Sequence, residues 1–202
     1  MASLRAGFVV ADEVIIREII NRIFCEFDAV PAIIGVALEG AFKENKNEYN
    51  KYFNDLRFKY ALNYNLFKCL IDGYDSIDKK YQKEVYSLIK KYAPNYDIYK
   101  GIKDIKVKVN VKSGFFVIVD FTKLKGKKDE FGKPIFNEYD LILYFYRNVN
   151  LRFLIGKSFA WPNKDELVGR FTFAKSQKEI INCVVKMNEA IDKLMWYYIC
   201  EV

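Results

Sequence analysis

The 202-residue sequence contains no histidine. Imidazole is the base of Ser-His and Cys-His catalytic pairs and a ligand in many zinc sites, so the sequence excludes these chemistries. The four cysteines, Cys25, Cys69, Cys183 and Cys200, lie far apart and form no C-x-x-C pair, which argues against a zinc knuckle or a redox dithiol. We therefore expect no metal site, and we expect buried, reduced thiols.

Long apolar runs are also missing. No stretch approaches the ~18 apolar residues that a membrane-spanning helix needs, and the N-terminus carries no signal-peptide pattern. The formal charge of +7, from 33 Lys and Arg against 26 Asp and Glu, permits attraction to phosphates, but no P-loop or nucleic-acid-binding motif accompanies it. We expect a cytoplasmic protein that binds neither a membrane nor nucleic acid.

What is present is a sequence with enough apolar residues to form a core, since 51% of it is hydrophobic. The apolar run at residues 4–11 predicts a buried strand, and Asp12 can cap the helix that follows it. Residues 32–42 predict a helix that is apolar nearly all round. A longer amphipathic helix is predicted over residues 49–71, with Gly73 as its C-terminal cap.

The second half of the chain alternates between helical and extended patterns. Ser76 can cap a helix that Pro94 ends, and the charged loop at 123–130 reads as a solvated turn. The alternation at 106–111 and 114–121 predicts a β-hairpin. The remaining predictions are a helix at 139–149 and a strand at 151–155.

The stretch from Val168 to Ala174 places one guanidinium inside a half-buried strand pattern. Alternation puts Phe171 and Phe173 on one face of the strand and Arg170 with Thr172 on the other. Residues 176–179 then have the spacing of a capping box, and apolar residues recur at helical intervals as far as Tyr198. The sequence therefore predicts a strand that leads into a long C-terminal helix.

Arg170 is open to two interpretations at this point. It can be an ordinary exposed arginine on a strand face. It can also be a planar fork that binds a carboxylate through two hydrogen bonds, a task for which lysine has the wrong geometry.

The order of four motifs resembles the C-terminal half of class I/II aminotransferases, enzymes of fold type I that use pyridoxal phosphate. The motifs are Gly114-Phe115-Phe116 with Asp120, Gly156-Lys157-Ser158-Phe159, the strand Gly169 to Ala174, and the helix after it. The resemblance implies that Arg170 binds the substrate α-carboxylate. One departure is Ile155, which stands where the family usually has proline.

The resemblance extends to Arg5-Ala6-Gly7. In the family an arginine in this context contacts the cofactor phosphate eight residues after the lysine that forms the Schiff base, which implies that Arg5 is the phosphate-binding residue. Counting back eight residues leads upstream of Met1, so we expect this chain to contain no catalytic residue of its own. Ser3 departs from the preferred Gly or Asn, and the alternative for Arg5 is a surface residue.

The resemblance implies an α+β or α/β fold, the C-terminal half of the pyridoxal-phosphate transferase fold, with a small antiparallel sheet covered by helices. It divides the chain into a remnant of the large domain (1–48), a connecting helix (49–73) and a small domain (74–202). The implied function is transfer of an amino group between an amino acid and a 2-oxo acid, inactive without an N-terminal half encoded upstream. The alternative is a non-catalytic remnant that dimerises without cofactor, and in either case we expect a homo-oligomer.

Overall fold

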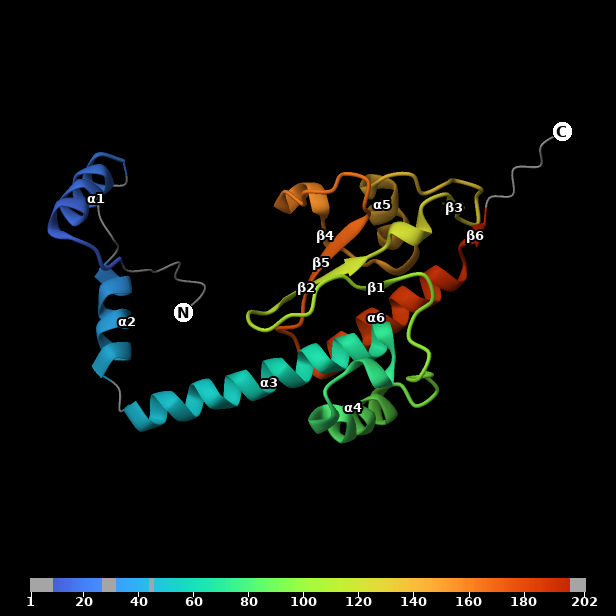
Figure 1. Cartoon of the computed structure of the whole chain (residues 1–202), viewed down its shortest axis with the longest axis horizontal. Coiled ribbons are helices and arrows are strands. Elements are labelled where there is room, and N and C mark those ends of the chain that lie inside the picture. Colours follow the sequence, from blue (N-terminus) through green and yellow to red (C-terminus); the bar gives the residue numbers. More distant parts are fainter. Residues whose placement is uncertain (1–8, 27–31, 44–45, 197–202) are drawn as a thin grey trace. The chain divides into compact units, whose positions relative to one another are not determined.

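The computed structural model describes residues 9–26, 32–43 and 46–196, shown in colour in Figure 1. The chain forms two compact units, Met1–Asp55 and Leu56–Val202. The first unit contains α1 (Glu13–Glu26), α2 (Ala32–Lys43) and the start of α3 (Lys46–Asp72). The predicted division at 48/49 and 73/74 stays a prediction.

Both helices predicted for the first unit are present. Many of the apolar side chains on them are exposed. The amide of Ile16 donates to the carbonyl of Asp12, so α1 begins where the sequence places its cap. Val14 is 79% exposed on α1 and Val36 is 68% exposed on α2. Residues 9–11 are not a strand, and the rest of the predicted strand at 4–11 lies outside the described residues.

The long helix α3 ends where the sequence predicts. Gly73 follows its last residue with φ of +94°, and a Cβ there would lie 2.7 Å from the carbonyl oxygen of Tyr99. Gly101 approaches equally closely, since its Cβ would meet the carbonyl oxygen of Ile71 at 2.5 Å. Two glycines therefore allow the loop after α4 (Lys79–Tyr92) to pack directly against the end of α3.

The second unit is built on a four-stranded antiparallel sheet in the order β1-β2-β5-β4. The two central strands, β2 (Phe116–Asp120) and β5 (Val168–Thr172), pair along their whole length with Val117 opposite Phe171. The outer strands are short: β1 covers Lys106–Val107 and β4 covers Leu154–Ile155. The predicted hairpin and edge strand are thus present, but shorter than the alternation suggests.

One face of this sheet carries the core. Phe171 lies 5.8 Å from Phe67 of α3, and Phe121 lies 5.5 Å from Phe145 of α5 (Glu138–Val149), measured between ring centroids. The hydroxyl of Tyr144 donates to the carbonyl of Ala190 on α6 (Gln177–Asp192) at 2.5 Å, which joins the two helices. Helices therefore cover this face (Figure 1), and the mixed α+β class that the sequence predicts is confirmed.

The remaining elements complete the second unit. Asp78, rather than the predicted Ser76, caps α4 (Lys79–Tyr92), because its carboxylate accepts from the amide of Lys80. Short 3₁₀ turns lie at Tyr74–Ser76 (η2), Thr122–Leu124 (η3) and Gly156–Phe159 (η4), and a second sheet pairs β3 (Lys127–Lys128) with β6 (Met195–Trp196).

Two predictions in this region are wrong. The C-terminal helix α6 ends at Asp192 instead of reaching Tyr198, because the chain turns there to enter β6; Tyr198 itself lies outside the described residues. The charged loop at 123–130 is not wholly solvated, because Lys127 is 5% exposed and its ammonium lies 2.7 Å from the carboxylate of Asp104. One lysine of this loop is therefore buried in an ion pair.

Within the described parts of the chain, no helix has the length and apolar character needed to cross a membrane.

Candidate functional site: the open face of the sheet

The second face of the sheet carries Arg170 on β5. The side chain of Phe171 on β5 points to the core. Its neighbours Arg170 and Thr172 point to the opposite face, as the alternation predicts. Gly169 is required beside them, because a Cβ there would lie 2.6 Å from the ring of Phe153 and 3.0 Å from that of Phe121. Gly169 therefore allows the core to pack tightly against β5, and Arg170 places its side chain on the opposite face of the sheet.

Two aromatic rings hold the guanidinium of Arg170. Its Cζ lies 4.5 Å from the ring centroid of Phe116 on β2 and 5.4 Å from that of Phe159 on η4. A planar cation packed on ring faces gains cation–π attraction and loses rotational freedom. The fork is thus fixed in orientation before any ligand arrives.

The guanidinium has a buried donor with no acceptor. The Nε of Arg170 is buried and has no hydrogen-bond partner, and among the described residues no carboxylate lies within 4.0 Å of its nitrogens. A buried unsatisfied donor costs about 1–3 kcal/mol, and more when it is charged. An acceptor that reaches this nitrogen recovers that cost, so the arrangement favours an anionic ligand.

The turn η4 places Phe159 over Arg170. Gly156 lies so close to its surroundings that a Cβ would meet Glu138 at 2.5 Å, Val168 at 2.8 Å and Trp161 at 3.0 Å. The carboxylate of Glu138 accepts from the amide of Lys157 at 3.1 Å. The Gly-x-Ser-Phe motif of the sequence therefore forms a turn that is hydrogen-bonded to α5 and packed closely against β5.

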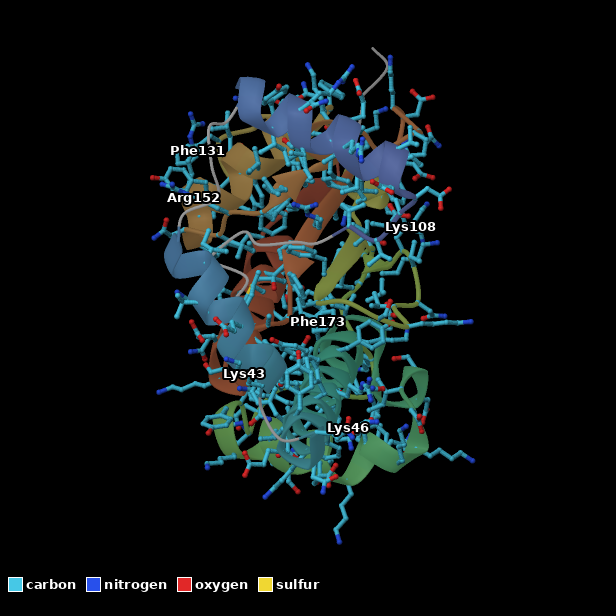
Figure 2. All side chains as sticks on the ribbon, turned by 90° about the vertical axis from the view of Figure 1, so that its left-hand side faces the viewer. Lys43, Lys46, Lys108, Phe131, Arg152 and Phe173 are labelled. Atoms are coloured by element: carbon cyan, nitrogen blue, oxygen red, sulfur yellow. The ribbon has the colours of Figure 1, made fainter. Side chains whose placement is uncertain are left out.

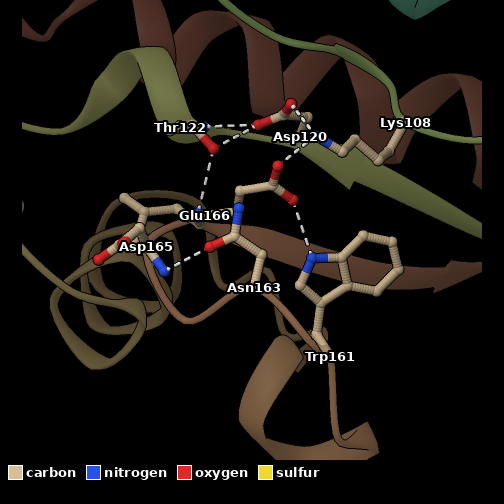
Figure 3. A network of polar contacts seen from close by, with 8 residues as sticks. Lys108, Asp120, Thr122, Trp161, Asn163, Asp165 and Glu166 are labelled. Atoms are coloured by element: carbon tan, nitrogen blue, oxygen red, sulfur yellow. Dashed lines mark hydrogen bonds and ion pairs between the residues drawn. The ribbon is translucent and has the colours of Figure 1, made fainter.

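A polar network holds the segment after this turn (Figure 3). The ammonium of Lys108 lies 2.7 Å from Glu166 and 3.2 Å from Asp120, the last residue of β2. The indole of Trp161 donates to Glu166 at 2.9 Å. All four side chains have hydrogen-bond partners, so this network fixes the chain between η4 and β5.

The charges of this network are stabilised by their hydrogen bonds. The bond to Glu166 raises the pKa of Lys108 above its usual value, and the bonds from Lys108 and Trp161 lower the pKa of Glu166. Burial disfavours the charged form of Asp120, but hydrogen bonds from Thr122 and Lys108 outweigh burial and lower its pKa. The cluster therefore stays ionised at neutral pH.

The far end of β5 is held by Asn63 of α3, which is fully buried. Its amide nitrogen donates to the carbonyls of Phe173 and Lys175, both at 2.9 Å. Ser176 then begins α6 with the predicted capping box, in which its hydroxyl accepts from the amide of Glu179 and the Glu179 carboxylate accepts from the amide of Ser176. The strand that carries Arg170 is anchored on both sides.

A pocket of about 480 Å³ opens next to Arg170. It lies where β4 and β5 separate, because their ladder ends at the pair Leu154 and Arg170. Its wall is mostly apolar and includes Phe67, Phe153, Phe171 and Ile180. A pocket of this size, with one fixed charged group at its side, is typical of a site for a small molecule.

The sequence identified only part of this site. Arg170 was predicted from the alternation and the resemblance, and Phe116 and Phe159 were recognised as motif residues without a role at the guanidinium. Lys108 and Glu166 gave no signal, because residues 58 positions apart come together only in the folded sheet. Arg5, the predicted phosphate-binding residue, lies outside the described residues.

The residues present do not fit pyridoxal phosphate itself. A Schiff-base lysine needs a lowered pKa and an amine aimed at the cofactor, whereas Lys175 at the pocket is exposed and lies 3.9 Å from Glu179, and the pKa of Lys108 is raised. Burial raises the pKa of the Cys183 thiol at the pocket to about 11. Arg170 fits a carboxylate, but the described residues supply no cofactor cradle. No cluster of three or more potential metal ligands occurs among them either.

Comparisons with known proteins add a distant structural likeness. No family model and no curated protein matches the sequence. Among solved structures, an aspartate aminotransferase from Rhizobium meliloti is similar, with 17% identity and a TM-score of 0.42. The match covers 58% of this chain and 27% of that one, so this chain corresponds to about a quarter of that protein's length. A likeness at this level assigns neither fold nor function.

Proposed function

We propose that this chain forms the substrate-carboxylate-binding part of a pyridoxal-phosphate-dependent aminotransferase, with Arg170 as the residue that binds the carboxylate. The observation that carries the proposal is the guanidinium held between Phe116 and Phe159 with a buried, unpartnered Nε. The motif resemblance supplies the reaction class, the transfer of an amino group between an amino acid and a 2-oxo acid.

The chain's own residues bind and orient the substrate in this proposal. The guanidinium of Arg170 donates two parallel hydrogen bonds to the carboxylate, and the rings keep the guanidinium from rotating. The cofactor and the lysine that reacts with it belong to an N-terminal partner, and Arg5 contributes to the cofactor phosphate. The isolated chain is then a binding unit without turnover.

Calorimetric titration tests the binding step. Pyruvate and 2-oxoglutarate should bind the chain with a Kd on the order of 1 mM, which corresponds to about 4 kcal/mol. Arg170→Lys should weaken both by roughly tenfold or more, because a point charge does not reproduce the bidentate pair. The matched control is Arg147→Lys, since Arg147 is an exposed arginine on α5 that is not among the residues lining this pocket.

Reconstitution tests the reaction class. The chain is mixed with pyridoxal phosphate, with and without the fragment encoded directly upstream, and amino transfer and a borohydride-reducible absorbance are recorded. Transfer should appear only with the fragment and should fall in Arg170→Lys. Turnover by the isolated chain, or transfer that ignores Arg170, contradicts the proposal.

A second candidate is a non-catalytic unit that self-associates. It is favoured by the exposed apolar side chains on α1 and α2, among them Val14 at 79% and Val36 at 68% exposure, because contiguous exposed apolar surface usually marks an interaction site. Sedimentation tests it: an oligomer at micromolar concentration that Val14→Lys with Val36→Lys dissociates supports this candidate. A strict monomer removes it.

A further inference from the structure

The pocket beside Arg170 is a wedge between two chain segments that start paired and then separate. Leu154 lies opposite Arg170 in the ladder, but the preceding residues 151–153 no longer pair with β5. The backbone of Thr172 therefore faces the opening, because alternate residues of β5 bond to β2 and to β4. The floor of the wedge is formed by Phe67 of α3 and by Ile180 and Cys183 of α6.

The wedge is apolar over most of its wall. Phe153 and Phe171 line it with their ring centroids 4.9 Å apart, and Leu151 adds a further apolar side chain. An apolar wall contributes to the free energy of binding when an apolar group of the ligand replaces the water on it. Each methylene that a ligand buries there strengthens binding by about fourfold, and an aromatic ring by roughly tenfold to a hundredfold.

The charges around the wedge favour a ligand with a single carboxylate. Three cationic side chains border it, but Arg152 packs on the ring of Tyr146 at 4.4 Å and Lys175 lies 3.9 Å from Glu179. Glu179 also accepts from the hydroxyl of Ser176, and its negative charge stands at the same rim. Arg170 is the cation whose buried nitrogen lacks an acceptor.

We infer that the site takes monocarboxylic substrates with a bulky apolar side chain, aromatic or branched aliphatic, in preference to dicarboxylates. The inference rests on the proposed function, because it places the substrate carboxylate on Arg170 and the substrate side chain in the wedge. The backbone groups of Thr172 can form hydrogen bonds with the polar atoms next to the substrate carboxylate. The apolar floor of the wedge then contacts the substrate side chain.

Three unreactive acids measure the preference directly: propionate, glutarate and 3-phenylpropionate, titrated into the full chain with the Kd taken from amide shifts. We expect 3-phenylpropionate to bind at least tenfold tighter than propionate, and glutarate to gain no more than about threefold. Arg170→Gln should weaken all three acids. Cys183→Phe, which fills the floor, should remove the advantage of 3-phenylpropionate over propionate.

The outcomes separate this inference from the proposed function. Equal binding of propionate and 3-phenylpropionate, or tighter binding of glutarate, overturns the inference while binding that depends on Arg170 keeps the proposed function. Binding of 3-phenylpropionate that ignores Arg170→Gln, or no binding of any acid, overturns the proposed function. If circular dichroism shows that Cys183→Phe does not fold, Leu151→Trp in the wall of the wedge takes its place with the same expectation.

Discussion

A cationic side chain lies at each end of β2, and the two cations differ in whether carboxylates pair with them. At its last residue, Asp120, the ammonium of Lys108 is paired with two carboxylates. At its first residue, Phe116, the guanidinium of Arg170 is packed on rings and has a buried nitrogen without an acceptor. Lys108 lies well apart from Arg152, which borders the wedge (Figure 2). The fold thus pairs the cation at one end of β2 with carboxylates and leaves a nitrogen of the other cation without an acceptor.

Under the proposed function, this difference separates a charge that stabilises the fold from a charge that binds a ligand. The chain supplies carboxylates where a cation has to stabilise the fold, as it does at Lys108 and at the buried pair of Lys127 with Asp104. At Arg170 the fold supplies no such carboxylate, and in the proposed function the ligand completes the buried donor, which is costly to leave unsatisfied.

The largest expected effect comes from breaking the paired end. Lys108→Met leaves Asp120, whose side chain is 10% exposed, without its counterion, and removing one partner of a largely buried pair is strongly destabilising. We expect the free energy of unfolding to fall by about 2–3 kcal/mol in urea denaturation. Lys106→Met on the exposed edge of β1 is the matched control, and an equal loss there would contradict the assignment.

A smaller effect is expected from moving the ring that packs on Arg170. Gly156→Ala places a methyl group 2.5 Å from Glu138 and 2.8 Å from Val168, so η4 has to shift and Phe159 with it. Stability should fall by about 1–2 kcal/mol, and carboxylate binding by several fold. Gly35→Ala in α2, where no atom lies within 4 Å of the new Cβ, should not weaken the protein.

The paired end should also respond to pH while the open end does not. Asp120 and Glu166 have lowered pKa values, so their contribution is complete above their unfolded pKa values near 4 and is lost as pH falls through the lower folded ones. Lys108 has a raised pKa, so its contribution is complete below about 10.4 and is lost as pH rises through the folded value. Fluorescence of Trp161 in a Trp196→Phe background should be constant between about pH 5 and 10 and change on both sides. A transition near neutral pH would contradict this.

The smallest change in stability is expected at Arg170 itself. Arg170→Met removes the unsatisfied nitrogen and also the cation–π contacts, each about 0.5–1 kcal/mol, and keeps an apolar stem between the rings. The two effects oppose each other, so the free energy of unfolding should change by less than about 1 kcal/mol while carboxylate binding is lost. A loss as large as that of Lys108→Met would show that Arg170 has a structural role.

The sequence predicted those features that depend on neighbours along the chain. The alternation of β5, the capping box at Ser176 and the end of α3 at Gly73 are local patterns, and the structure confirms each of them. The length of α6 depends on tertiary contacts instead, because the chain after Asp192 turns to pair with β3. The ladder of β1 stops just after Lys108, whose amide still donates to the carbonyl of Ile118 at 2.8 Å. No local pattern carries that information.

The same distinction applies to the candidate site. Arg170 stood out because a guanidinium interrupts an apolar strand, and its motif named the possible role. Its packing on Phe116, which lies 170 − 116 = 54 positions earlier, and the part of the wedge that Phe67 of α3 lines bring together segments that are distant in sequence. The buried, unpartnered nitrogen is visible only in three dimensions.

The measurement that tests the account most directly follows the Nε–H group of Arg170 by ¹⁵N nuclear magnetic resonance during a titration with propionate, with Arg170→Lys used to assign the signal. A carboxylate that completes this donor should move the signal downfield and saturate it with the same Kd that calorimetry gives. A signal that stays fixed while propionate binds, or an Nε–H that is already hydrogen-bonded in the free protein, would contradict the claim that Arg170 awaits a carboxylate.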